Sequence, residues 1–118
     1  MASKKLINEV NLCVEDCLQG LVATNPGLQI LDGHRVVVRG DIDEIKQAGR
    51  VTLMSGGGSG HEPAFAGYVG KGCLSAAVAG SVFASPPPKS ILAGLLTLAK
   101  LNPSGILVVC TNRLFMHV

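Results

Sequence analysis

The sequence predicts an α/β domain in which a parallel or mixed sheet is flanked by helices. Short runs of β-branched residues alternate with amphipathic or polar segments, which is the order expected of a layered α/β fold. Apolar residues make up 47% of the sequence but aromatic residues only 3%, so the core is aliphatic, as it is around buried strands. A chain of 118 residues is one domain or part of one.

The N-terminal segment predicts an amphipathic helix over residues 6–22. Apolar side chains recur there at the i, i+3, i+4 and i+7 positions of a helix, and Asn25-Pro26-Gly27 ends it. This helix carries Cys13 and Cys17 one turn apart, a pair that could hold a metal in principle. No His or acidic partner accompanies them at ligand spacing, so we favour small buried thiols, no metal site and a reducing compartment.

The rest of the chain divides into short strands and helices separated by Gly, Pro, Asp and Asn. Val-rich runs predict strands, and prolines or polar caps predict helix starts, with Ser85 expected as a cap. In order, we expect an extended piece over 28–31, a strand over 34–39, a short polar helix or turn over 41–47, a strand over 50–54, a glycine loop, a helix opening at 62–68, a strand over 74–79, a helix over 91–100 and a strand over 106–109.

Charge and hydropathy exclude two classes of partner. The net charge is only +2, and no basic stripe is interleaved with aromatic residues, so nothing indicates nucleic-acid binding. The N-terminus lacks the apolar core of a signal peptide, and the longest apolar stretches fall short of the ~20 residues of a membrane span. We therefore expect a soluble, cytoplasmic protein with no membrane contact.

The stretch MSGGGSGHEP, residues 54–63, is the most informative part of the sequence. The phosphate-binding, dinucleotide-binding and nucleophile-elbow motifs all fail here by at least one position. A glycine turn between a strand and a helix still offers free backbone N–H groups to a ligand, and His61 would stand at its lip. Such a loop suits a polyol, a hydroxyketone or a phosphate. The alternative is a tight connection with a surface histidine and a capping Glu62.

The other polar residues carry weaker signals. His34 precedes a strand and is read as a surface or hydrogen-bonded histidine. Lys71 lies between two glycines and is read as solvated. The acidic residues Asp41, Asp43 and Glu44 have no His or Cys partners and are read as a solvated helix start.

Three segments resemble the dihydroxyacetone (glycerone) kinase family. They are SGGGSGHEPAFAGYVGKG (55–72), NPGLQIL with HRVVVR (25–39) and VFASPPPKSIL (82–92). The resemblance is to the start of the dihydroxyacetone-binding domain, and it is closer to the animal branch, the triokinase/FMN cyclases. It covers residues 1–109, which we assign to an incomplete portion of that larger substrate domain, and it is lost over a divergent tail at 110–118.

The resemblance implies a function and a site. The family phosphorylates dihydroxyacetone or glyceraldehyde with ATP, and its glycine loop and histidine bind the ketose, which points here to Gly58, Ser59, Gly60 and His61. His61 would hydrogen-bond the substrate and assist proton transfer. The family binds ATP and Mg²⁺ on a separate helical domain, holds the ketose on a second histidine further along, and assembles as dimers.

Those further regions are not in this sequence, and His117 lies in the tail and does not match the second histidine. We therefore expect a homodimeric, triose-binding family member whose isolated chain is inactive. Two alternatives stay open: a non-catalytic truncated isoform that acts as an interaction or dimerisation fragment, and a small polyol- or phosphate-binding module.

Overall fold

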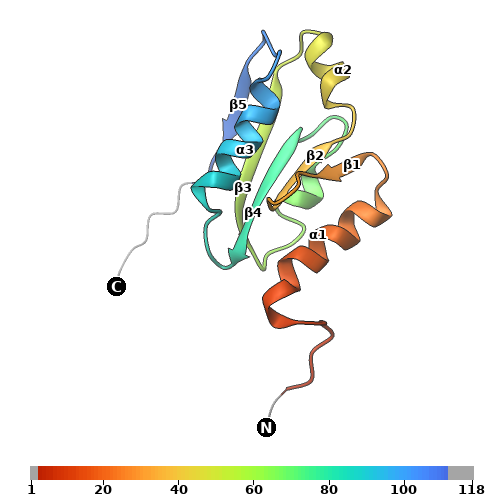
Figure 1. The fold of residues 1–118 in the computed structure, drawn as a ribbon, viewed down its shortest axis with the longest axis vertical. Coiled ribbons are helices and arrows are strands. Elements are labelled where there is room, and N and C mark those ends of the chain that lie inside the picture. The colour runs from red at the N-terminus through yellow and green to blue at the C-terminus, as the bar shows by residue number, and fades with distance from the viewer. Residues whose placement is uncertain (1–2, 112–118) are drawn as a thin grey trace.

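The computed structural model describes residues 3–111. Of the tail predicted at 110–118, residues 112–118, with His117, lie outside them. The helices and strands are η1 (Val10–Leu12), α1 (Cys13–Thr24), β1 (Leu28–Ile30), β2 (Val36–Arg39), α2 (Ile42–Gln47), β3 (Thr52–Ser59), η2 (Ala66–Tyr68), β4 (Ala76–Val82), α3 (Pro88–Ala99) and β5 (Ile106–Val109). The η elements are 3₁₀ helices. The predicted α/β class is confirmed (Figure 1).

The five strands form one mixed sheet in the order β1-β2-β4-β3-β5. Strands β3, β4 and β5 run parallel, whereas β1 pairs with β2 and β2 with β4 in antiparallel fashion. The Asp32-Gly33 turn, where Gly33 has a positive φ of 72°, lies between β1 and β2. Of the strands described between residues 3 and 111, β1 and β5 therefore form the two edges.

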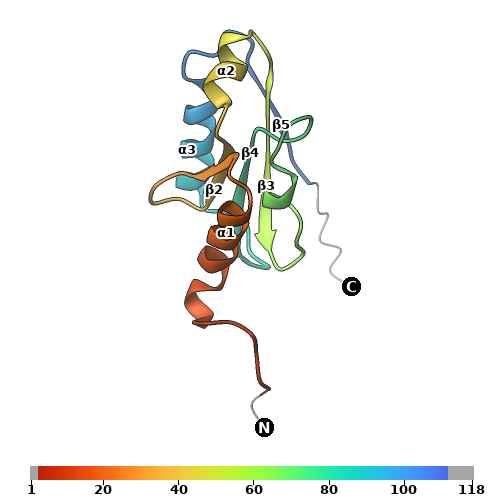
Figure 2. The same ribbon diagram turned by 90° about the vertical axis from the view of Figure 1, so that its right-hand side faces the viewer.

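Helix α1 covers one face of the sheet, together with part of the chain between β3 and β4. Its buried Val14 and Leu18 pack with Val37 and Ala77 of the sheet, and Phe65 joins this cluster from the connecting segment. Figure 2 shows α2 and α3 together to the left of β3, with α1 below them and nearer the centre. Successive side chains of a strand point to opposite faces of the sheet. Val37 of β2 therefore faces α1, whereas Val36 and Val38 face the other side.

Helices α3 and α2 cover the opposite face. Val36, Met54 and Val78 from three strands pack there against Leu98 of α3, which has no exposed surface. Gly94 lets α3 approach closely, since a Cβ on it would lie 3.2 Å from the sulfur of Met54. β2 and β4 are thus covered on both faces, which is why their residues are β-branched or small.

Three predicted elements differ from the structure. The α-helix begins at Cys13 rather than at residue 6, because Leu6 is 98% exposed and has no sheet beneath it. The helix expected from Pro63 is a turn followed by the short η2. The expected glycine loop is also wrong in part, since β3 runs to Ser59 and pairs with β4 through Gly56 and Gly57.

The helix-cap prediction for Ser85 is wrong as well, because α3 begins at Pro88 with Pro87 in the capping position. Within residues 3–111, none of the helices is long and apolar enough to cross a membrane.

Candidate functional site

The predicted site residues lie where β3 ends. Gly58 and Ser59 are the last two residues of β3, and Gly60 and His61 follow them. Because β3, β4 and β5 are parallel, their carboxyl ends lie on the same side of the sheet. Open α/β sheets bind ligands beside the carboxyl ends of their parallel strands.

The missing side chains of the glycines make room for other parts of the protein. A Cβ on Gly57 would meet the Phe65 ring at 2.5 Å, and one on Gly60 would meet the Phe83 ring at 2.9 Å. A Cβ on Gly58 would meet the backbone N of Ala84 at 2.9 Å. The glycine run therefore lets two rings and the segment after β4 pack against β3.

Three of the polar groups at these strand ends are already paired within the protein. The buried Ser59 hydroxyl donates to the Gly80 carbonyl oxygen at 2.9 Å. The Gly60 N–H lies 3.1 Å from both carboxylate oxygens of Glu62 and donates to that carboxylate. Because no helix begins at residue 62, Glu62 stabilises a local turn and does not cap a helix. The Ser59 carbonyl oxygen accepts from the Phe83 N–H at 2.7 Å.

His61 lies in an exposed stretch with Gly60 and Glu62, and its side chain is presented to solvent. Its only aromatic contact in the described chain is edge-on to Phe65, with the ring centroids 5.9 Å apart. Near neutral pH an imidazole donates or accepts a proton. Of the four predicted site residues, His61 is the one whose side chain is presented to solvent at the strand ends.

A cavity of about 250 Å³ lies behind the glycine segment, between that segment and α1. Gly57, Gly58 and Ser59 line it from β3, Cys17 and Leu21 from α1, and residues 62–67 close one side. His61 is not among its lining residues. The site residues therefore border a cavity on the α1 side, while His61 stands outside it.

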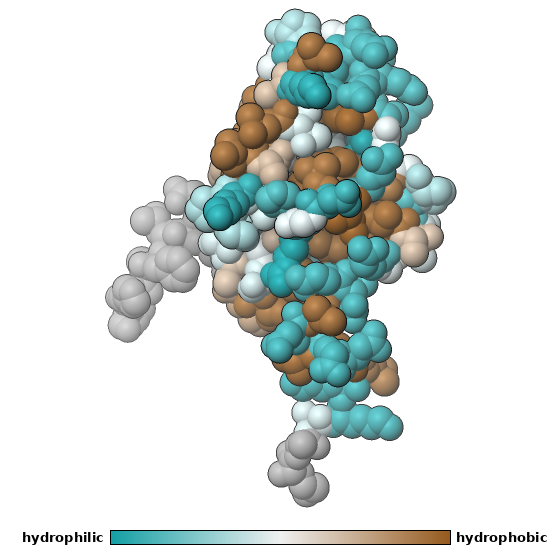
Figure 3. Space-filling model, viewed as in Figure 1, coloured by the Kyte–Doolittle hydropathy of each residue, from teal (hydrophilic) through white to brown (hydrophobic). Residues whose placement is uncertain are grey.

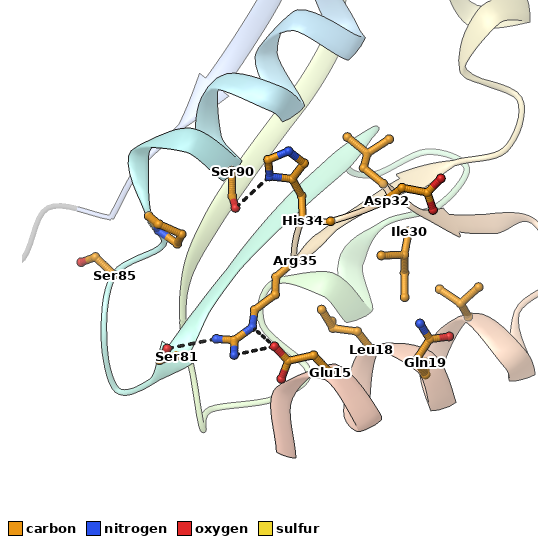
Figure 4. Close-up of a pocket in the computed structure, with 14 residues that line it drawn as sticks. Glu15, Leu18, Gln19, Ile30, Asp32, His34, Arg35, Ser81, Ser85 and Ser90 are labelled. Atoms are coloured by element: carbon orange, nitrogen blue, oxygen red, sulfur yellow. Dashed lines mark hydrogen bonds and ion pairs between the residues drawn. The ribbon is translucent and has the colours of Figure 1, made fainter. Parts of the chain in front are cut away.

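A larger cleft of about 800 Å³ lies between α1, the β1–β2 turn and the start of α3 (Figure 4). Arg35 crosses it: its Nε donates to Glu15 Oε1 at 2.6 Å and its Nη1 to the Ser81 hydroxyl at 3.0 Å. On the other side, His34 Nδ1 lies 3.3 Å from the Ser90 hydroxyl, so the expectation of a hydrogen-bonded histidine is met.

Glu15 has a lowered pKa in this cleft. Burial by itself would raise the pKa, but a backbone hydrogen bond and the Arg35 guanidinium outweigh it. Sequence reasoning did not find this ion pair, because Glu15 and Arg35 are 20 residues apart and nothing local links them.

The acidic residues and the thiols make local contacts. Asp41 pairs with Arg39 at 2.6 Å, and Asp43 pairs with Lys46 at 2.8 Å on the first turn of α2. Lys71 is exposed, as expected.

The two cysteines of α1 form no disulfide. Cys13 is half-buried and Cys17 is exposed, so the expectation of buried thiols is wrong for Cys17. Across residues 3–111 no group of three His, Cys, Asp or Glu side chains is arranged to hold a metal.

The chain is similar to known proteins over most of its length. The Dak1 domain model matches residues 19–113. The chain is 56% identical to triokinase/FMN cyclase of Mus musculus over 95% of its own length and 19% of the mouse protein. It is 46% identical to the dihydroxyacetone-binding subunit of a dihydroxyacetone kinase of Listeria innocua, over 92% of this chain and 32% of that protein.

A solved structure is similar in fold as well. The dihydroxyacetone kinase of C. freundii, in complex with AMP-PNP and Mg²⁺, superposes with a TM-score of 0.83 and 37% identity, over 95% of this chain and 21% of that one. The chain therefore spans about a fifth of the length of the animal and C. freundii proteins that it matches.

Proposed function

The chain belongs to the Dak1 domain family, and we propose that it forms the N-terminal part of the dihydroxyacetone-binding domain of a triokinase/FMN cyclase-like kinase. The whole protein would transfer the γ-phosphate of ATP to dihydroxyacetone or glyceraldehyde in the cytoplasm, as a homodimer. We assign residues 1–109 to this domain and residues 110–118 to a divergent tail. The similarity to the mouse triokinase/FMN cyclase over 95% of the chain supports this proposal.

We place one side of the ketose site at Gly58, Ser59, Gly60 and His61. The observation that carries this assignment is the exposed His61 side chain at the carboxyl end of three parallel strands. Ser59 and Gly60 are already paired, to Gly80 and Glu62, so they shape the site more than they bind the ligand. His61 would hydrogen-bond the triose and take up the proton that its hydroxyl loses on phosphorylation.

We propose that ATP and Mg²⁺ bind to a part of the longer protein outside this chain. Phosphoryl transfer depends on positioning and on charge neutralisation by a metal and cationic groups. In the part of the chain that the structure describes, no set of three ligands is assembled for a metal. The isolated chain would then bind triose weakly and turn nothing over.

A binding titration tests the site. Dihydroxyacetone added to the ¹⁵N-labelled chain should shift the amide resonances of Gly58–His61. The His61→Ala variant should weaken binding by about fivefold or more, the effect of losing roughly 1 kcal/mol. His34→Ala is the matched control, since His34 lies at the other cleft and should leave the affinity unchanged. Equal affinities in both variants would remove His61 from the site.

An ATP-dependent coupled assay tests the inactivity of the isolated chain. We expect no phosphorylation of dihydroxyacetone above the background without enzyme. Calorimetry with dihydroxyacetone and with inorganic phosphate separates the ketose site from a simple polyol- or phosphate-binding module.

A second candidate function is that of an interaction fragment, and the exposed edge at β5 favours it. Leu107, Val108 and Val109 are 54%, 44% and 48% exposed. Apolar side chains also gather over α3, where Leu92 and Leu96 are exposed (Figure 3). An apolar edge strand pairs readily with another chain. Sedimentation of the chain and of Val108→Lys tests this: a concentration-dependent dimer that the lysine disperses would support it, and a monomer in both would refute it.

A further inference from the structure

The cavity behind the glycine segment has a lining suited to a particular class of ligand. It measures about 250 Å³ and is closed by α1 on one side and by β3 with residues 62–67 on the other. Val14, Leu18 and Leu21 line it from α1, and Phe65 lines it from the connecting segment. An apolar cavity of roughly 150 Å³ in another protein is large enough for benzene or xenon.

Only two polar side chains besides the Cys17 thiol line this cavity, and both are engaged within the protein. The Ser59 hydroxyl donates to Gly80, and both oxygens of Glu62 accept from the Gly60 N–H. Burial, Glu62 and Cys13 raise the pKa of the Cys17 thiol, so Cys17 is uncharged at neutral pH. A polyol placed here would lose most of its hydrogen bonds to water, because the greater part of the lining is apolar and cannot replace them.

We propose that this cavity is a binding site for a small, uncharged, apolar molecule of about the size of benzene, and that it excludes trioses. Apolar surface leaving water supplies the driving force, because most of the lining is apolar. Cys17 is solvent-exposed and also lines the cavity, so it marks the opening.

The Phe65 ring connects this cavity to His61. It lines the cavity, packs against Gly57 and meets the His61 ring edge-on at 5.9 Å. A ligand in the cavity contacts one side of Phe65, and His61 contacts another. Occupancy therefore shifts the position of the imidazole. Its effect on triose binding rests on the function proposed above, whereas the shift itself does not.

Benzene is a suitable probe. Titrated into the ¹⁵N,¹³C-labelled chain, it should give saturable shifts at Gly57, Ala79 and Phe65, together with a shift of the His61 ring resonances. Dihydroxyacetone and glycerol should neither produce these shifts at Gly57 and Ala79 nor displace benzene. Absence of saturable shifts at the cavity residues, or displacement by glycerol, overturns the proposal.

Two cysteine variants provide a matched pair. Cys17→Phe fills the opening and should weaken benzene binding by about tenfold or more. Cys73→Phe places the same ring on an exposed thiol position outside this cavity and should leave the affinity unchanged. If Cys17→Phe does not fold, Cys17→Met serves as a smaller filler with the same expected direction. Equal affinities in the Cys17 and Cys73 variants would refute the assignment.

The two proposals fail in different ways. A chain that binds benzene at Gly57 and Ala79 but shows no His61 effect on dihydroxyacetone keeps the cavity and loses the ketose site. A chain that binds dihydroxyacetone through His61 but not benzene keeps the ketose site and loses the cavity ligand.

Discussion

The two faces of the sheet are packed by one long helix each, yet they differ in the space beside the buried leucine of that helix. A pocket of about 420 Å³ lies between α2 and the end of α3, but Leu98 does not line it. On the α3 face, Leu98 has no exposed surface and lines none of the cavities described for residues 3–111, and Gly94 brings α3 close to Met54. On the α1 face, Leu18 is also buried, but it lines both the large cleft and the apolar cavity. The α3 helix is thus packed tightly around its buried leucine, whereas the α1 face leaves space beside the strand that carries the candidate site.

The largest expected difference concerns the two buried leucines. Leu98→Ala should destabilise the chain toward the upper end of about 2–5 kcal/mol, because its neighbours fully enclose it. Leu18→Ala should fall toward the lower end, since Leu18 already borders empty space and loses fewer contacts. Urea unfolding followed by circular dichroism measures both. Equal costs would mean that the faces are packed alike.

Two adjacent glycines of β3 provide the next test. Gly56→Ala would bring a Cβ to 2.5 Å from the Val78 carbonyl oxygen, which is backbone within the sheet and cannot move aside. Gly57→Ala would meet the edge of the Phe65 ring at 2.5 Å, and that ring borders a cavity into which it can turn. We expect Gly56→Ala to cost about 1–3 kcal/mol and Gly57→Ala clearly less. The opposite order in urea unfolding would contradict the comparison.

These glycines also show where prediction from sequence fails. The Val-rich strand β2 and the helix α3 follow from residue patterns, because each buries a recognisable apolar face. The strand β5 follows from its run of β-branched and aliphatic residues, although three of its four residues are exposed. The glycine segment has no side chains to show a period, so the sequence favours a loop. The structure nevertheless keeps it in β3, because a parallel ladder is made by the backbone and β4 supplies the partner.

The candidate site was predictable to a similar extent. The sequence singles out His61 and expects it at the surface, but it does not predict the contact with Phe65, which depends on how residues 60–65 turn. It does not predict the cavity either, because the lining comes from three separate segments. The hydrogen bond from Arg35 to Ser81 joins residues that are 46 positions apart in the sequence, so no local sequence pattern could predict it.

A smaller difference should appear between the glycines within the two helices. A Cβ on Gly20 of α1 meets nothing within 4 Å, so Gly20→Ala should stabilise the chain by about 0.5–1 kcal/mol through helix propensity alone. Gly94→Ala in α3 gains the same propensity, but its Cβ would lie 3.2 Å from the Met54 sulfur. We expect that gain to be offset in part or reversed. Melting temperatures of the two variants measure the difference, and an equal gain would show that α3 has room to move.

The smallest expected effect concerns the polar contact that each helix makes with the residues just before β2. Glu15 of α1 forms a charged pair with Arg35, whereas Ser90 of α3 hydrogen-bonds His34. The pKa of Glu15 is lowered from its ordinary value of 4.5, so its contribution is present above that value and is lost as the pH falls through the folded value. The Glu15 side chain is 41% exposed, and such pairs contribute only about 0.2–1 kcal/mol.

Acidification should therefore loosen α1 before α3. Arg35→Met removes the charged partner, returns the pKa of Glu15 toward its ordinary value and should flatten the fall of stability with pH below about pH 5. Ser90→Ala removes the other link and should lower stability by a similar amount across that acidic range, because the serine does not titrate. Urea midpoints of the three proteins between pH 7 and pH 3 give the slopes. If Arg35→Met keeps the slope of the unmodified chain, the ion pair does not hold α1, and the looser packing of that face must be explained by its cavities alone.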